Sequence, residues 1–68
     1  MDERLRDAKM CLYALGQAYR NDWSDCDGRT IMVQLEEIGM VIDGKMLVED
    51  FLANNGIVEQ KHGFTWED

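Results

Sequence analysis

Residues 2–20 read DERLRDAKMCLYALGQAYR, and apolar side chains recur along them at alternating steps of three and four residues. This spacing places the apolar residues on one side of an α-helix, which turns once about every 3.6 residues. Acidic residues near the beginning and Arg20 at the end suit the dipole of that helix. The sequence therefore predicts a helix from about Asp2 to Tyr19 with one buried stripe. The stripe consists of Leu5, Ala8, Leu12, Leu15 and Tyr19.

A second helix is expected after a short polar connection at residues 21–24. Ser24 followed by Asp27 matches the capping-box pattern and indicates that the helix starts at Ser24. Two apolar stripes joined by a short loop favour an antiparallel helical hairpin. The stripe of the second helix, with steps of four, three and four, consists of Ile31, Leu35, Ile38 and Ile42.

A third and shorter helix is expected from about Lys45 to Asn54. Asp43-Gly44 interrupts the second stripe and can cap this helix. Asn55-Gly56 then ends it, because Gly56 readily adopts the left-handed conformation and lets Ile57 pack back against the helix.

The end of the chain has the pattern of a small β-hairpin. A loop at residues 61–63 would set Val58 opposite Trp66 and Gln60 opposite Phe64. Val58, Phe64 and Trp66 would share one face, which must pack on the helices because an isolated hairpin is barely stable. The predicted fold class is mainly α: an antiparallel helical hairpin and a short third helix, followed by a small C-terminal β-hairpin.

The chain has 68 residues, which is enough for one small domain with a thin core. Hydrophobic residues make up 46% and charged residues 31%, a balance typical of globular rather than disordered proteins. We therefore expect residues 1–68 to form a single small acidic helical domain.

Several features favour a cytoplasmic protein. Residues 1–9 contain no apolar run of the kind found in a secretory signal. No segment approaches the roughly 20 apolar residues of a membrane span. Two cysteines are too few for the disulfide scaffold of a small secreted domain.

The net charge of −7 is unevenly distributed along the chain. Residues 1–20 hold three acids and four bases, whereas residues 21–68 hold eleven acids and three bases. A negative field repels the phosphates of nucleic acids and attracts a basic surface. We therefore expect a protein partner with a basic surface and no direct nucleic-acid binding. The acidic residues expected to face this partner are Asp22, Asp25, Asp27, Glu36, Glu37, Glu49 and Asp50.

The sequence around residues 25–28 does not predict a calcium site. Asp25-x-Asp27-Gly28 is similar to the middle of an EF-hand loop, but Trp23 and Gln34 would occupy its first and last ligand positions. Calcium sites need a carboxylate at the first of these positions and usually a glutamate at the last. The acids are better explained as side chains that cap a helix.

Catalysis, a cofactor and other metals are not expected either. Cys11, Cys26 and His62 lack the paired spacing of a structural zinc site. Across the predicted helical hairpin, Cys11 and Cys26 would lie roughly 12 Å apart, which is too far for a disulfide. His62 falls at the tip of a turn, and the adjacent carboxylates Glu36-Glu37 and Glu49-Asp50 point in different directions around a helix.

Interface-type side chains occupy the sides of the two long helices that lie opposite the predicted stripes. Arginine, tyrosine and methionine are enriched at protein interfaces, whereas a solvated helix face normally carries lysine and glutamate. We therefore expect a homodimer centred on the first helix. The alternatives are a monomer that uses this face on its target, or a face covered by the C-terminal part of the chain. The expected interface consists of Arg6, Met10, Tyr13, Gln17, Val33 and Met40.

In size, acidity and lack of catalytic residues, the chain resembles small accessory proteins of phages and mobile elements, including anti-CRISPRs and host-enzyme inhibitors. The resemblance implies an inhibitor or modulator of a basic, nucleic-acid-handling protein in the host cytoplasm. The acidic helices would then imitate the spaced phosphates of DNA.

Two other functions are compatible with the sequence. An antitoxin-like or adaptor subunit would bind one protein partner through apolar helix faces, with charge only steering the encounter. A winged-helix domain has the same order of three helices and a hairpin, but its reading helix would carry Glu49 and Asp50 against the single Lys45. Because this charge is unsuited to a DNA groove, that alternative implies a winged-helix-like domain adapted to protein binding.

Overall fold

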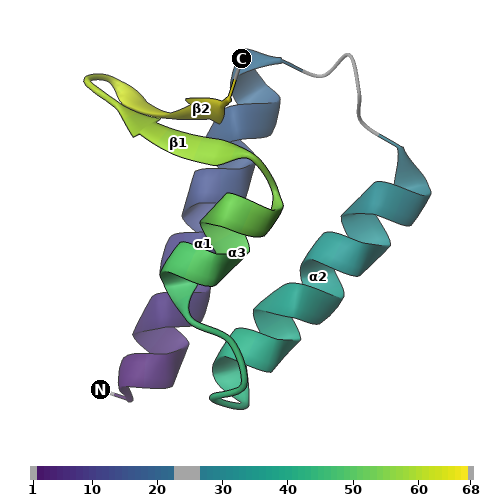
Figure 1. The fold of residues 1–68 in the computed structure, drawn as a ribbon, viewed down its shortest axis with the longest axis vertical. Helices are drawn as coiled ribbons and strands as arrows, with labels where there is room; N and C mark the ends of the chain where they lie inside the picture. Colours follow the sequence, from purple (N-terminus) through teal and green to yellow (C-terminus); the bar gives the residue numbers. More distant parts are fainter. Residues whose placement is uncertain (1, 23–26, 68) are drawn as a thin grey trace.

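The structure, a computed structural model, describes residues 2–22 and 27–67. Three helices precede two strands, which confirms the predicted fold class: mainly α with a small C-terminal β-hairpin (Figure 1). The elements are α1 (Glu3–Asn21), α2 (Gly28–Ile42), α3 (Val48–Asn54), β1 (Ile57–Gln60) and β2 (Gly63–Trp66). None of these helices is long and apolar enough to cross a membrane.

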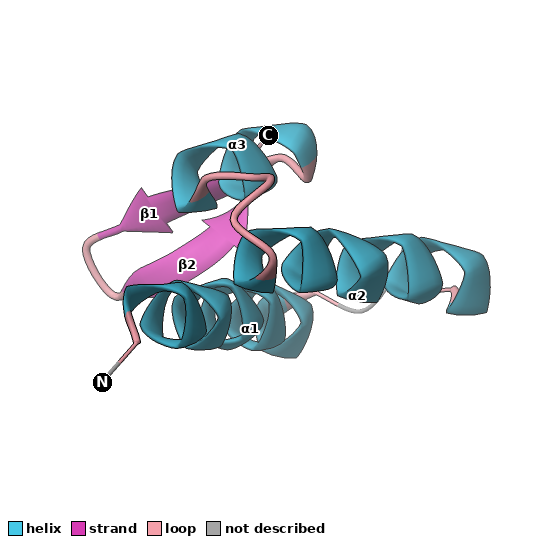
Figure 2. Ribbon diagram, turned by 90° about the horizontal axis from the view of Figure 1, so that it is seen from below, coloured by secondary structure: helices cyan, strands magenta, loops and turns pink. Residues whose placement is uncertain are grey.

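The elements form two layers. Figure 2 shows α1 and α2 side by side, with α3 and the hairpin together on one side of this helical pair. The central element is α1, which contacts α2, α3 and both strands, whereas α2 contacts α1 and α3. On the opposite side of the helical pair, no other described element covers α1 or α2 (Figure 2).

Aspartate side chains cap the two long helices. Asp2 Oδ1 accepts a 2.9 Å hydrogen bond from the backbone N–H of Arg4. Asp27 accepts from the backbone N–H of Thr30 at 2.8 Å and from its hydroxyl at 3.0 Å. These bonds lower the pKa of the Asp27 carboxyl, because they stabilise its charged form. The cap of α2 is thus Asp27 and not the predicted Ser24, which lies outside the described residues.

One glycine ends the preceding helix before α3, and another follows α3 directly after its cap residue. Gly44 has a φ of +76°, in the left-handed region, and follows the end of α2. The helix then begins at Val48, three residues later than predicted, and Leu47 precedes it without a side-chain cap. Gly56 follows the helix with a φ of +63°, as predicted, and Ile57 packs back into the core.

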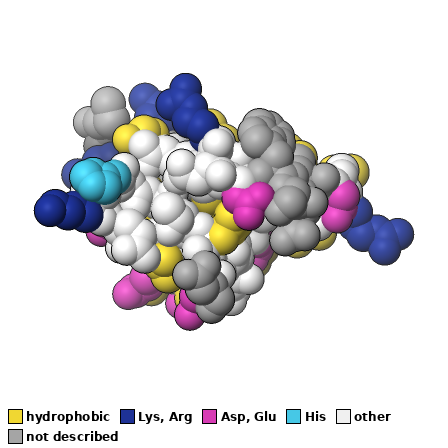
Figure 3. Space-filling model, turned by 90° about the horizontal axis from the view of Figure 1, so that it is seen from above, with side chains coloured by type: hydrophobic (Ala, Val, Ile, Leu, Met, Phe, Trp, Pro, Cys, Tyr) yellow, Lys and Arg dark blue, Asp and Glu magenta, His cyan; other side chains and the backbone are white. Residues whose placement is uncertain are grey.

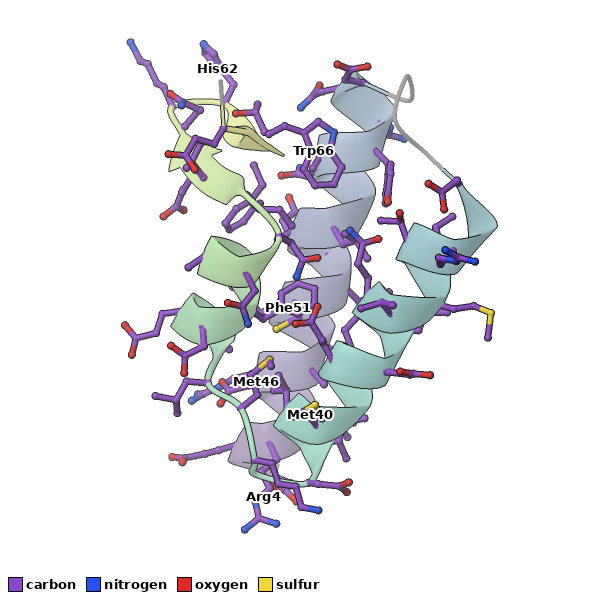
Figure 4. All side chains as sticks on the ribbon, turned by 45° about the vertical axis from the view of Figure 1, so that its right-hand side comes forward. Arg4, Met40, Met46, Phe51, His62 and Trp66 are labelled. Atoms are coloured by element: carbon purple, nitrogen blue, oxygen red, sulfur yellow. The ribbon has the colours of Figure 1, made fainter. Side chains whose placement is uncertain are left out.

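The core is built on small side chains of α1. Cys11, Ala14 and Ala18 have no exposed surface, and their small size lets α3 and the hairpin approach the helix closely. Phe51 of α3 is also fully buried and points toward the interior (Figure 4). The buried residues of the described chain are Ala8, Cys11, Ala14, Leu15, Ala18, Tyr19, Gln34, Ile38, Val41, Phe51, Ile57 and Phe64.

The buried sides of α1 and α2 differ from the predicted stripes. The stripe residues buried as predicted are Ala8, Leu15, Tyr19 and Ile38. The prediction is wrong for four others, whose exposed fractions are 46% for Leu5, 55% for Leu12, 52% for Leu35 and 45% for Ile42. Both helices are rotated so that the small side chains of α1 face the second layer. The larger aliphatic residues consequently lie on the uncovered side of the helical pair.

The hairpin pairs in a register one residue away from the predicted one. Ile57 lies opposite Trp66, where the sequence predicts Val58. The loop between the strands has two residues instead of the predicted three, which accounts for the shift. Phe64 and Trp66 share one face as predicted, but Ile57 rather than Val58 lies beside them and is buried.

Candidate protein interface

Four exposed aliphatic residues lie on the uncovered side of the helical pair, and we call them the open face. They are Leu5 and Leu12 of α1 and Leu35 and Ile42 of α2. In each helix the two residues are seven positions apart, which places them on the same side two turns apart. The residues between them on the stripes, such as Ala8 and Ile38, point into the core. The helical pair is therefore apolar on both of its sides.

The two halves of the open face begin at the same end of the helical pair. At one end of the pair, the Arg4 side chain packs against Gly44. Farther along, the Tyr19 hydroxyl bonds to Gln34. Because α1 and α2 run antiparallel between these contacts, Leu5 lies near the level of Ile42, and Leu12 and Leu35 follow toward the other end of the pair.

The edges of the open face carry opposite net charges. Along the outer edge of α1, the helical spacing places Lys9 and Arg20 next to the open face, and both are exposed. Along the outer edge of α2 it places Arg29, Glu36 and Asp43, also exposed. The α1 edge is thus basic, and the α2 edge carries two acids and one base.

The predicted interface on α1 lies partly against the hairpin. Gln17 Oε1 accepts a 3.0 Å hydrogen bond from the backbone N–H of Phe64, and Gln17 Nε2 donates to the Tyr13 hydroxyl at 2.8 Å. The ring of Tyr13 meets that of Phe64 edge-on, with centroids 6.3 Å apart. Arg6 and Met10 are exposed. Half of this predicted face thus holds β2 in place, which corresponds to the alternative that the C-terminal part covers it.

The predicted interface residues on α2 belong to a different surface. Val33 and Met40 are exposed and lie about half a helical turn from Leu35 and Ile42. The strands contact α1 and not α2, so the structure does not bring these residues together with the α1 group at the hairpin.

The predicted acidic residues are spread over several elements, and Asp25 lies outside the described residues. Glu37 joins α2 to α3: its carboxylate accepts from the Asn55 side-chain amide at 3.0 Å and from that of Asn54 at 3.4 Å. Asp27 caps α2. The predicted acids that are exposed within the helices are Glu36, Glu49 and Asp50.

A cavity of about 370 Å³ opens where α1, α2, the end of α3 and β2 meet. Tyr19, Gln34 and Trp66 are among the side chains that line it, and so is the remaining predicted acid, Asp22. Trp66 lies against the end of α1 in Figure 4. Figure 3 looks onto this end of the molecule, where acidic and hydrophobic side chains adjoin and the lysines and arginines lie toward the rim.

Of the soft metal ligands considered in the sequence, the structure describes Cys11 and His62. Burial and the nearby charge of Asp7 raise the pKa of the Cys11 thiol to about 11, so this thiol stays protonated. His62 is exposed in the hairpin loop and points away from the body of the molecule (Figure 4). Within residues 2–22 and 27–67, no group of three or more Cys, His, Asp or Glu side chains is placed to hold a metal. Cys26 lies outside the described residues, so the predicted separation of Cys11 and Cys26 stays a prediction.

Sequence reasoning missed the open face and the cavity for different reasons. The small residues Cys11, Ala14 and Ala18, three and four positions apart, form a second stripe on α1 that competes with the leucines for the core. The cavity joins residues such as Tyr19 and Trp66, and no local pattern brings these together.

No protein-family model, curated protein or solved structure matches this chain. The order of elements that suggests a winged-helix domain is present, but no similar solved structure supports that kinship. The function proposed for this chain therefore rests on the open face, the charge and the cavity.

Proposed function

We propose that this chain is a small acidic protein–protein interaction module that pairs through its open face and binds a basic protein. The observation that carries this proposal is the exposure of Leu5, Leu12, Leu35 and Ile42, which the helical spacing places on one side of each helix. Burying apolar surface contributes about 25 cal/mol per Å², and extended apolar patches on small proteins mark interaction sites.

The spacing of these residues supports a second copy of the chain as the occupant. On each helix the two open-face residues are seven positions apart, which is the period of a heptad repeat, and two helical hairpins packed face to face through such positions form a four-helix bundle. A two-fold axis along the helices would set the Lys9–Arg20 edge against the Glu36–Asp43 edge of the second copy. These opposite charges favour that arrangement. The face around Met10 and Tyr13 is the alternative interface, although Tyr13 and Gln17 already contact the hairpin.

The negative charge outside α1 supports a basic partner. Glu36, Glu49 and Asp50 are exposed on the outer surfaces of α2 and α3. We propose that the partner is a nucleic-acid-handling protein, which the module inhibits or modulates as small phage accessory proteins do. Charge of this kind steers association and makes binding sensitive to salt.

The second candidate is the antitoxin-like or adaptor subunit, and the apolar character of the open face favours it. In that case the open face would bind a different protein instead of a second copy of the chain. The affinity would change little with salt, because burial of apolar area contributes most of the binding free energy. The chain would then be a monomer when its partner is absent.

Light scattering after gel filtration tests the pairing directly. The unaltered chain should have the mass of a dimer, and Leu12→Glu or Leu35→Glu should give a folded monomer, because either change places a charge in the apolar interface. Val33→Glu is the matched control: it adds the same charge to an equally exposed position on the other side of α2. A monomeric parent at high micromolar concentration contradicts the dimer. If the dimer persists in Leu12→Glu but is lost in Met10→Glu, the interface is the alternative face around Met10 and Tyr13.

A separate experiment tests the partner. Host proteins are captured on the immobilised chain and on a Glu49→Gln, Asp50→Asn variant, which leaves the Glu36–Asp43 edge intact, at low and at high salt. The proposal expects a basic protein that is lost with the variant and at high salt. A protein that resists salt and is lost only with Leu12→Glu would support the adaptor instead.

A further inference from the structure

The cavity at the hairpin end has two aromatic walls that are held in place. The rings of Tyr19 and Trp66 meet at 76°, with their centroids 4.9 Å apart. Trp66 Nε1 donates a 3.1 Å hydrogen bond to the backbone carbonyl of Asp22, and the Tyr19 hydroxyl donates to Gln34 Oε1 at 2.7 Å. Both rings are thus oriented before any ligand arrives, so little side-chain entropy is lost when one binds.

Several polar groups of the lining offer acceptors, whereas Gln34, whose oxygen is engaged by Tyr19, offers its side-chain nitrogen as a donor. The side-chain nitrogen of Asn55 donates to the Phe51 carbonyl at 2.8 Å and to Glu37 at 3.0 Å. That of Asn54 donates to Glu37 as well. With both amide nitrogens engaged, each side chain keeps its carbonyl oxygen for another partner. The Thr30 hydroxyl donates to Asp27 and likewise keeps its lone pairs.

The charge of the cavity also favours a cation. The acidic residues Asp22 and Glu67 are among the lining residues, and none of the lining residues in the described part of the chain is basic. A concave site with charges of one sign focuses the electrostatic field inside it. A ligand that carries positive charge and several N–H donors therefore matches the lining.

We propose that this cavity binds the guanidinium group of an arginine side chain on the protein partner. Guanidinium is planar, carries five N–H donors and is weakly hydrated, so it stacks on aromatic rings while donating to surrounding oxygens. An ammonium group has fewer donors and is more strongly hydrated. The assignment rests on the proposed function, since it supplies the contact by which a basic partner would be recognised.

A titration of the full chain followed by NMR tests this assignment. The probe is N-acetyl-arginine amide, and the matched control is N-acetyl-citrulline amide, which has nearly the same shape without the charge. We expect the arginine probe to shift the Trp66 indole N–H and the side-chain amides of Asn54 and Asn55 in a saturable way. The citrulline probe should bind at least about tenfold more weakly, because it loses the charge-assisted bonds. Equal binding of the two probes, or no shift at these groups, overturns the proposal.

Variants show whether the shifts report the cavity. Glu67→Gln should weaken binding of the arginine probe about tenfold. Glu59→Gln removes the same charge from an exposed position of β1 outside the cavity, and it should leave the affinity unchanged. Trp66→Ala should abolish binding of the arginine probe. If this variant disturbs the fold, the comparison of Glu67→Gln with Glu59→Gln still shows whether the probe binds in the cavity. An equal loss in both glutamate variants would mean that only the overall charge matters, which overturns the site.

Free arginine and a short peptide with a central arginine distinguish the two sources of the group. Binding of the peptide at least as tight as that of free arginine supports a protein side chain. Tighter binding of free arginine by about tenfold or more overturns that part of the assignment. If no arginine probe binds while the dimer and the salt-sensitive partner persist, the cavity assignment is wrong and the proposed function stands.

Discussion

The hydroxyl of Tyr19 donates a 2.7 Å hydrogen bond to Gln34 Oε1 and so joins α1 to α2 inside the molecule. Gln34 is the one polar side chain buried in the described part of the chain, with 3% of its surface exposed. The same pair forms part of the cavity wall. A buried acceptor that loses its donor costs about 1–3 kcal/mol, so this bond couples helix packing to the shape of the candidate site.

Removal of the Tyr19 hydroxyl should therefore destabilise the fold. We expect Tyr19→Phe to lower the free energy of unfolding by about 1–3 kcal/mol, because Gln34 loses its hydrogen bond. Adding Gln34→Leu to that variant should recover part of the loss, since neither partner is then left unsatisfied. Urea unfolding followed by circular dichroism measures the parent, Tyr19→Phe, Gln34→Leu and the double variant. Strictly additive losses in the double variant would mean that the two groups are not coupled.

Core substitutions should separate the buried residues from the open face. Phe51→Ala should cost about 3–5 kcal/mol, because it empties a fully buried position in a thin core. The sequence stripe alone predicts about 2–5 kcal/mol for Leu12→Ala and Leu35→Ala. The exposure of both residues now predicts about 1 kcal/mol or less in the dilute monomer. Thermal and urea unfolding at low concentration check the difference, and a large loss for Leu12→Ala would show that the helix rotation is wrong.

The hairpin should depend on Gln17. Gln17→Ala removes the acceptor for the Phe64 backbone N–H, so the exchange of this amide hydrogen with solvent should accelerate. Tyr13→Phe is the control, since it keeps the ring contact with Phe64 and the Gln17 acceptor and loses only the hydroxyl. Hydrogen exchange measured by NMR compares the two variants. Unchanged exchange of Phe64 in Gln17→Ala would contradict the role of this bond.

Stability should fall in alkaline solution because of Cys11. Burial raises the pKa of this thiol to about 11, whereas in the unfolded chain it ionises near the ordinary value of about 9. The folded state therefore prefers the neutral thiol: its contribution to stability is complete below pH 9 and is lost as the pH rises toward 11. Unfolding curves across this range measure the effect in a Cys26→Ser background. In the further variant Cys11→Ala the alkaline fall should be smaller, and an identical fall would exclude Cys11 as its cause.

The sequence by itself determined which elements form and in what order. Periodic apolar residues in helix-forming segments, Asp2 before the first helix, and glycines at positions 44 and 56 act over a few neighbouring residues, so their effect can be read locally. Phe64 and Trp66 likewise share a face because side chains alternate along a strand. The functional predictions from acidity and from the lack of catalytic residues concern partners outside the chain, and they stay predictions.

Only the tertiary structure decided how far each helix is rotated, the register of the hairpin and the existence of the cavity. On α1, both the leucine stripe and the small residues around Cys11 could face the core. The side with the small residues is the buried one, because it lets Phe51 and the hairpin pack close to the helix. Ile57 is buried in place of Val58 because the two-residue loop shifts the register of the hairpin. Close packing is a property of all the contacting surfaces together, which is why Leu12 and Leu35 look like core residues in the sequence and lie exposed in the fold.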